Sequence, residues 1–269
     1  MATEDEDDIE NFVANIANSF PFRHVHISGI LQFCNMKIEI CASTVEALVG
    51  AQTLKVDRVE LCSNLEQGGL TPSSGFIRMA MNLGLNTQVL IRPRPGGFVY
   101  HQDEIALILN EVEWLSNMGV DGIVVGLTTE DLRLHRKVIQ EIRERFTKEI
   151  TIHRAFDDLV EWRPELEWLI DIGVDRVLSS GLATSAANGI PTLSEMVSLA
   201  GGKIEIMAGG GINLANVEEI MRKVKPAAVH FSATLKVSVD PKSLFSENRL
   251  MFDANKAKKL VELCRNFSE

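Results

Sequence analysis

Two short segments of the sequence end in a cysteine that follows a glutamate by two positions. They are IEIC (38–41) and VELC (59–62), which carry Glu39 with Cys41 and Glu60 with Cys62. If the two segments form neighbouring β-strands, alternation places the glutamate and the cysteine of each strand on the same face of the sheet. The two thiols then lie at the same edge of the sheet. Soft sulfur ligands select Cu(I) over harder ions, so two thiolates in this position would suit a Cu(I) ion. The alternative is that both cysteines are small buried apolar residues.

A second set of candidate residues lies in the segments HRAFD (153–157) and RPR (92–94). Arg92 and Arg94 could hold a carboxylate or phosphate through two parallel hydrogen bonds. His153 could act as a general acid or base beside the two glutamates. This enzyme hypothesis assigns catalysis to four residues, namely His153, Glu39, Glu60 and Asp157.

Glycines supply a third candidate feature, because Gly209, Gly210 and Gly211 follow one of the predicted strands. Barrel enzymes commonly bind phosphate through backbone N–H groups at such a position. The alternative is a tight turn that needs positive φ angles. The predicted ligand-binding residues are Arg92, Arg94, Ser180, Gly209, Gly210 and Gly211.

Eight β-rich segments would position these residues, and they alternate with helical stretches from Lys37 onward. Such alternation is typical of consecutive βα units, and eight units with right-handed crossovers close into a (β/α)8 TIM barrel. The expected strands are 38–41, 58–62, 88–92, 122–126, 150–154, 176–180, 204–208 and 227–231. Ser43 is expected to cap the first helix of the barrel, and a last helix is expected near 253–267.

Strand alternation also predicts which side chains face the barrel axis. The apolar residues of each strand must face the helices, which turns the polar ones inward. The inward set is Glu39, Cys41, Arg58, Glu60, Cys62, Arg92, His153, Arg176, Glu205, Met207 and His230. Three carboxylates (Glu39, Glu60, Glu205) and three guanidiniums (Arg58, Arg92, Arg176) would then form a neutral ion-pair network.

Composition limits the classes of partner. The net charge of −10 opposes binding to nucleic acid or to an anionic membrane surface. No apolar run reaches the roughly 18 residues of a membrane span, and the acidic start is unlike a signal peptide, so a cytoplasmic location is expected.

Residues 1–36 contain six acids and one base, so they carry −5 of the net charge of −10. They are predicted to be an acidic extension before a barrel domain at 37–269.

The strand-end motifs resemble those of the CutC family. DRVELCSNLEQGGLTPS, IRPRPGGFVY, TIHRAFD, RVLSSG, MAGGGI and VHFSA follow one another in the family's order over about residues 36–235. The resemblance implies a TIM barrel of copper homeostasis, with Cys41 and Cys62 as Cu(I) ligands and a homo-oligomer, either a dimer or a tetramer. Gly97 and Ala208 stand where family members often have an acid and a proline.

Two functional hypotheses therefore follow from the sequence. One is a copper-binding protein that uses Cys41 and Cys62. The other is a barrel enzyme that acts on a small phosphorylated or carboxylated metabolite through the arginines, His153 and the glycine loop. The partner is accordingly a copper ion or a small anionic ligand, and the sequence leaves the question of catalysis open.

Overall fold

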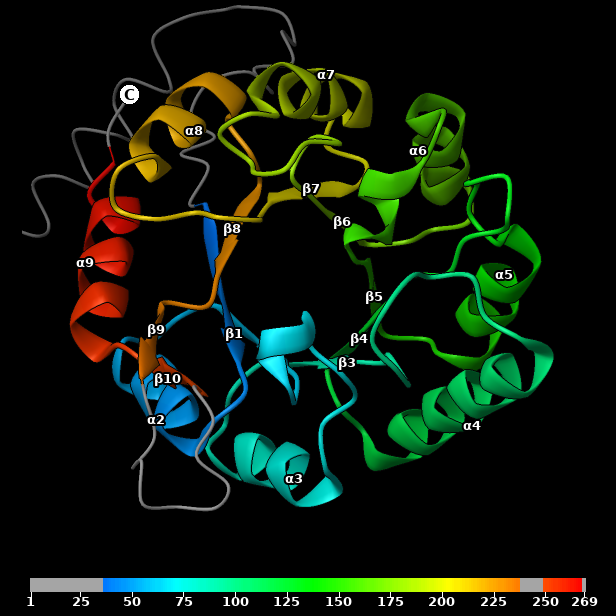
Figure 1. Ribbon diagram of the computed structural model, residues 1–269, viewed down its shortest axis with the longest axis horizontal. Coiled ribbons are helices and arrows are strands. Elements are labelled where there is room, and N and C mark those ends of the chain that lie inside the picture. Colours follow the sequence, from blue (N-terminus) through cyan, green and yellow to red (C-terminus); the bar gives the residue numbers. More distant parts are fainter. Residues whose placement is uncertain (1–35, 238–248, 268–269) are drawn as a thin grey trace, which may run out of the picture. The chain divides into compact units, whose positions relative to one another are not determined.

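Eight parallel strands form a closed barrel in the computed structural model, which describes residues 36–237 and 249–267 (Figure 1). The strands pair in sequence order, and β8 pairs with β1 to close the ring. They are β1 (Lys37–Ala42), β2 (Arg58–Leu61), β3 (Thr87–Leu90), β4 (Gly122–Val125), β5 (Glu149–Ile152), β6 (Arg176–Ser179), β7 (Glu205–Ala208) and β8 (Ala228–Phe231). The predicted (β/α)8 barrel is confirmed.

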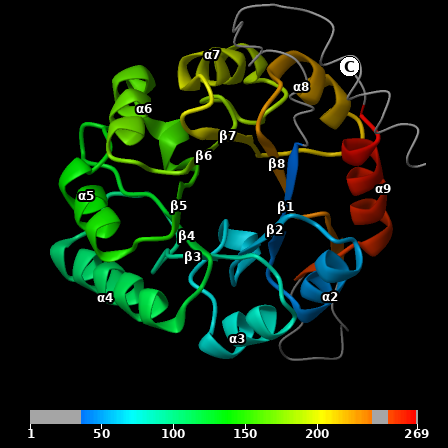
Figure 2. The same ribbon diagram turned by 180° about the vertical axis from the view of Figure 1, so that it is seen from behind.

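Helices surround the barrel in chain order, as the two opposite views show (Figures 1 and 2). They are α2 (Val45–Thr53), α3 (Ser74–Asn82), α4 (Gln102–Met118), α5 (Arg136–Arg145), α6 (Trp162–Asp171), α7 (Ile190–Ala200), α8 (Val217–Val224) and α9 (Ala254–Arg265). Two short 3-10 helices, η1 (Leu65–Gln67) and η2 (Arg154–Asp158), follow β2 and β5, and β9 (Thr234–Val237) pairs with β10 (Arg249–Phe252). No helix in the described ranges is long and apolar enough to cross a membrane.

The apolar core lies between the strands and the helices, as alternation predicts. Ile38, Ile40, Val59 and Leu61 are at most 1% exposed and belong to the large core cluster. The inward apolar side chains form two separate small clusters inside the barrel, one with Cys41, Cys62, Leu90 and Val124 and one with Leu178, Met207 and Ala228. The phase predicted for the strands is therefore correct.

A network of ion pairs fills the interior nearer the amino ends of the strands. Arg58 Nε donates to Glu39 at 2.9 Å and its Nη1 donates to Glu205 at 2.9 Å. Arg176 pairs with Glu205 at 2.8 Å and with Glu149 at 3.2 Å. Burying these charges is tolerable because each has an opposite partner.

The predicted membership of this network is wrong for two residues. Arg92 comes after the last residue of β3, so its guanidinium lies in the loops beyond the strand and bonds backbone carbonyls instead. Glu60 is a partner of His230 at the carboxyl ends of the strands. Arg58, Arg176, Glu39 and Glu205 are in the network as expected.

Helix caps agree with the sequence in part. Thr44, rather than Ser43, caps α2, because its side chain accepts from the N–H of Ala47 at 3.2 Å. Asp253 caps α9, so the final helix is confirmed. The predicted extension lies outside the described residues except for Met36, and β1 begins at Lys37.

Candidate functional site

A pocket of about 510 Å³ lies at the carboxyl ends of the barrel strands. Residues from β1, β2 and β8 and from the segments after β3, β5 and β7 line it, and active sites of TIM barrels lie at this end. Of the predicted site residues, its lining includes Cys41, Glu60, Arg92, His153, Gly210 and Gly211. Another pocket, of about 840 Å³, lies between α8 and α9 and contains none of the predicted residues.

The two predicted thiols meet beside this pocket. Cys41 is the last residue of β1 that faces the barrel axis. Cys62 comes directly after β2, which pairs with β1 in parallel register. Their Sγ atoms are 3.5 Å apart, and the residues are 6% and 1% exposed. All three cysteines in the described ranges are free, including Cys264 on α9. A pair of adjacent reduced thiols is therefore available to a soft metal ion.

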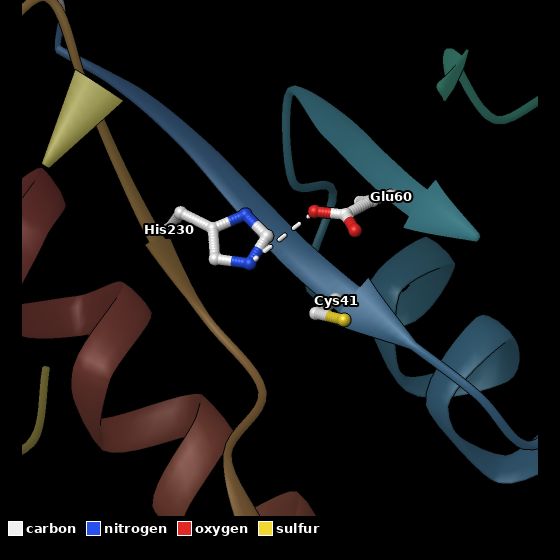
Figure 3. Close-up of side chains that lie close together, drawn as sticks. All are labelled: Cys41, Glu60 and His230. Atoms are coloured by element: carbon white, nitrogen blue, oxygen red, sulfur yellow. Dashed lines mark ion pairs between the residues drawn. The ribbon is translucent and has the colours of Figure 1, made fainter. Parts of the chain in front are cut away.

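His230 joins the thiols because the barrel closes. It lies on β8 in register with Glu39 of β1, and its Nδ1 is 2.9 Å from Glu39 Oε1. Its Nε2 is 3.4 Å from Glu60 Oε2, the ion pair drawn in Figure 3. One ligand atom each from Cys41, Glu60 and His230 lies within 4.8 Å of the others, which is metal-binding proximity.

Opposite charges hold this cluster together. Burial raises the pKa of Glu39, but the hydrogen bond and charge of His230 and the charge of Arg58 outweigh burial and lower that pKa to about 2. Burial also raises the pKa of Glu60, to about 7, against the lowering effect of His230. Burial lowers the pKa of His230, yet the two glutamates raise it well above its ordinary value. His230 is accordingly an imidazolium when no metal is bound.

The thiol of Cys41 is protonated under the same conditions. Its hydrogen bond to Cys62, its burial and the charge of Glu60 raise its pKa well above the ordinary value. A metal that binds this sulfur must therefore displace a proton.

His153 lies in the same pocket as a neutral side chain. Its Nδ1 accepts the N–H of Ala155 at 3.0 Å, which places the ring proton on Nε2. Burial and the charge of Arg92 lower its pKa to about 3. The ring packs against Phe98 with centroids 4.8 Å apart, and Nε2 has no hydrogen-bond partner among the described residues. His153 thus lines the pocket as a neutral ring whose Nε2–H is unpaired.

Arg92 fixes the loops that follow β2 and β3. Its Nη1 donates to the carbonyls of Gln67 at 3.0 Å and Gly69 at 2.9 Å, and its Nη2 donates to the carbonyl of Gly96 at 2.7 Å. The guanidinium also lies 5.2 Å from the centre of the Phe98 ring. Both terminal nitrogens already donate to carbonyls of the protein. They are therefore not free to form the two parallel hydrogen bonds to a ligand that the sequence predicted.

Arg94 lies outside the lining of this pocket. Its guanidinium pairs with Glu104 of α4, with Nη2 3.3 Å from Oε2, and stacks on Tyr100. It also donates to the carbonyls of Gly97 and Val99. Its predicted role in anion binding therefore has no support in the geometry, because a carboxylate of the protein already occupies the guanidinium.

Asp157 and Ser180 hold the loop after β6. Asp157 accepts hydrogen bonds from the Ser179 hydroxyl at 2.6 Å and from the backbone N–H groups of Ser180 and Leu182. Its other oxygen accepts from the Ser180 hydroxyl and from Arg154 Nε, both at 2.8 Å. Asp157 is outside the pocket lining, and this bonding favours a positioning role over the predicted catalytic one.

The three glycines make a tight turn. The Gly209 N–H donates to the carbonyl of Ser179 at 3.0 Å, so it is not available to a phosphate. A side chain at Gly209 would meet Leu178, at 2.4 Å from the new Cβ. Gly210 and Gly211 have φ angles of +92° and +75°, which only glycine adopts readily. Packing and backbone angles thus account for all three glycines.

Strand alternation predicted that the side chain of His230 faces the barrel axis, but His230 was not among the predicted site residues. Closure of an eight-strand barrel puts strand eight beside strand one, and that signal pairs His230 with Glu39. Lys256 also lines the pocket, from the first turn of α9, and strand alternation could not have placed it there.

The fold is a TIM barrel, and its candidate functional residues lie at the carboxyl ends of the strands. The family model described as the CutC family matches residues 36–235. A family protein CutC from Glaesserella parasuis is 39% identical over 200 residues, covering 74% of this chain and 82% of that protein. One from Mesorhizobium japonicum is 40% identical over 198 residues, covering 73% and 77%.

Solved structures agree with this assignment. A candidate copper homeostasis protein CutC from Streptococcus agalactiae superposes with a TM-score of 0.69 at 28% identity, covering 73% of this chain and 98% of that one. N-(5'-phosphoribosyl)anthranilate isomerase from Pyrococcus furiosus, at a TM-score of 0.53 and 16% identity, shares the fold alone. The chain belongs to the CutC family.

Proposed function

We propose that this protein binds one Cu(I) ion through the thiolates of Cys41 and Cys62. The observation that carries the proposal is the 3.5 Å separation of their Sγ atoms beside the pocket. Two cysteines 21 positions apart in sequence meet only because β1 and β2 pair in register. Adjacent thiolates favour Cu(I) over magnesium or calcium, which prefer oxygen ligands.

His230 can supply a third ligand. Its Nε2 belongs to the group of ligand atoms within 4.8 Å that includes the Cys41 sulfur, while Nδ1 bonds to Glu39. A histidine that binds a metal through one nitrogen commonly donates the other N–H to a carboxylate, which fixes the ring. Glu39 is already in that position, 2.9 Å from Nδ1.

Proton release should accompany metal binding at this position. Without metal, His230 pairs with both Glu39 and Glu60. Binding of Cu(I) to the two thiols and to Nε2 would release up to three protons for one metal charge, so the affinity for Cu(I) should rise with pH.

A titration with Cu(I) under anaerobic conditions, in competition with a chromophoric chelator, tests this function. The wild-type chain should bind one tight ion. The double variant Cys41→Ser, Cys62→Ser should lose that ion, because hydroxyl oxygen is a poor ligand for Cu(I).

Cys264 provides the matched control. Its thiol is also buried, on α9, and Cys264→Ser should leave the stoichiometry at one ion. Circular dichroism melting curves should show that all three proteins fold. If the folded double variant binds Cu(I) as tightly as wild type, the thiols are not the ligands.

We also propose that the protein works as a cytoplasmic homo-oligomer. A reducing compartment would keep the adjacent thiols reduced, as copper binding requires. Sedimentation velocity of the purified chain tests the assembly, and a monomer at micromolar concentration would contradict it.

A further inference from the structure

The pocket offers hydrogen-bonding groups that a copper ion would not use. Five buried side-chain polar atoms have no hydrogen-bond partner in the described part of the chain, and three of them belong to residues that line this pocket. The three are Arg92 Nε, His153 Nε2 and Glu60 Oε2. Buried polar groups nearly always have a partner, so this concentration points to a ligand.

Two of the three atoms are donors. Arg92 Nε carries its own hydrogen while the terminal nitrogens bond carbonyls of the loops. His153 presents Nε2–H because its Nδ1 accepts the backbone N–H of Ala155. The side of the pocket formed after β3 and β5 therefore requires an acceptor.

The acceptor should carry a negative charge. Arg92 is 7% exposed, and within residues 36–237 and 249–267 its guanidinium bonds only backbone carbonyls and no carboxylate. Its bonded partners are neutral carbonyl oxygens, which leave the buried charge uncompensated. An anionic oxygen would complete the hydrogen bond of Nε and balance that charge.

A carboxylate suits this position better than a phosphate. Among the unpaired donors there is one cationic group, Arg92, and one neutral group, His153, which matches a single negative charge. The Gly209 N–H, which is already bonded to Ser179, adds no donor for a dianion. Phosphate sites usually combine several backbone N–H groups with a helix N-terminus.

The third atom requires the opposite kind of group. Glu60 Oε2 lies 3.4 Å from His230 Nε2 but accepts no hydrogen bond from the described residues. Glu60, on β2, would repel the carboxylate of a ligand. The same ligand must therefore approach Glu60 with a different group. A hydroxyl group can donate to it without adding charge.

We propose that this pocket binds a small hydroxycarboxylate. Its carboxylate accepts hydrogen bonds from Arg92 Nε and His153 Nε2, and a hydroxyl donates to Glu60 Oε2. The volume of about 510 Å³ is within the range of small-molecule sites. The ligand contacts do not depend on copper, so this site can be tested whether or not the protein binds the metal.

Isothermal titration calorimetry of the copper-free full chain tests the site with three probes of increasing length, glycerate, threonate and gluconate. At least one should bind with a Kd below about 1 mM. Three controls each lack a required feature: hexanoate has no hydroxyl, glucose has no carboxylate, and glucose 6-phosphate carries a phosphate dianion in place of a carboxylate. Each control should bind at least about tenfold more weakly than the best hydroxy acid.

Variants of His153 separate a ligand contact from a structural role. In His153→Asn the amide oxygen can still accept from Ala155, but no donor reaches the position of Nε2, so affinity should fall about tenfold or more. His153→Gln places an amide N–H near that position and should recover most of the affinity. His135→Asn, at the N-terminus of α5 and outside the pocket, should bind like wild type.

Three results would overturn the proposal. The first is that none of the three hydroxy acids binds, which would mean that water alone satisfies the pocket. The second is that hexanoate, glucose or glucose 6-phosphate binds as tightly as the best hydroxy acid. The third is that folded His153→Asn, judged by its melting curve, keeps wild-type affinity.

Discussion

Replacement of Asp157 by asparagine tests whether the HRAFD segment positions the loop after β6 or takes part in chemistry. The side chain is 7% exposed and its two oxygens accept from Ser180 and Arg154 on one side and from Ser179 and Leu182 on the other. Asparagine keeps the shape and one acceptor oxygen. Its amide nitrogen would face the Ser180 hydroxyl and Arg154 Nε, which are both donors to Asp157.

The cost follows from these lost acceptors. A buried donor left without a partner costs about 1–3 kcal/mol. The Ser180 hydroxyl has one hydrogen and a second acceptor, the carbonyl of Ala183 at 2.6 Å, so it can turn to that carbonyl. The Arg154 side chain is 42% exposed and can turn to water. Both losses are therefore discounted, and the expected loss is about 1–2 kcal/mol, equivalent to roughly 2–8 °C in Tm for a domain of this size.

Differential scanning calorimetry of Asp157→Asn beside Asp158→Asn measures this effect. Asp158 is the exposed neighbour, and its change should alter stability by no more than about 0.5 kcal/mol. A difference of 2 °C in Tm corresponds to about half a kcal/mol. If the two variants melt within 2 °C of each other, Asp157 does not hold the loop, and the result favours the catalytic hypothesis for Asp157.

Four further predictions follow from the described contacts. Apparent Cu(I) affinity should rise with pH, by about tenfold per pH unit for each proton released, and pH-independent affinity would contradict thiol binding. Because the folded pKa of Glu39, about 2, is below the ordinary 4.5, its ionised form stabilises the fold above pH 4.5 and this contribution disappears as the pH falls toward 2. Glu39→Gln should therefore lower stability in urea at pH 7 more than at pH 3, and equal losses would refute the assignment. Gly122→Ala should cost about 1–3 kcal/mol in urea unfolding, since its Cβ would lie 1.9 Å from Gln88 Oε1, whereas Gly75→Ala in the open first turn of α3 should not destabilise. Deletion of residues 1–36 should change Tm by less than about 5 °C, because β1 begins at Lys37.

The sequence was sufficient for the barrel and for the position of the thiols. Both follow from alternation along β-strands, a short-range pattern that burial of one face enforces. Cys41 and Cys62 therefore meet where the pattern puts them. His230 required one more step, the closure of the barrel that places β8 beside β1.

The residues of the loops could not be placed by the same reasoning. Arg94 pairs with Glu104, ten positions later, because the loop after β3 returns to the N-terminus of α4. Arg92 bonds carbonyls of two loops, which no pattern of side chains encodes. Asp157 similarly bonds backbone N–H groups of the loop after β6. These contacts depend on loop paths that alternation does not determine.

X-ray absorption at the copper K-edge tests the central claim most directly, because it identifies the atoms around the metal. Protein loaded anaerobically with one equivalent of Cu(I) should show two sulfur ligands, and a nitrogen or oxygen ligand where His230 takes part. The sulfur signal should disappear in the Cys41→Ser, Cys62→Ser variant. A wild-type spectrum with only nitrogen and oxygen neighbours, or sulfur ligands that persist in the double variant, would contradict the assignment of Cys41 and Cys62 as the copper site.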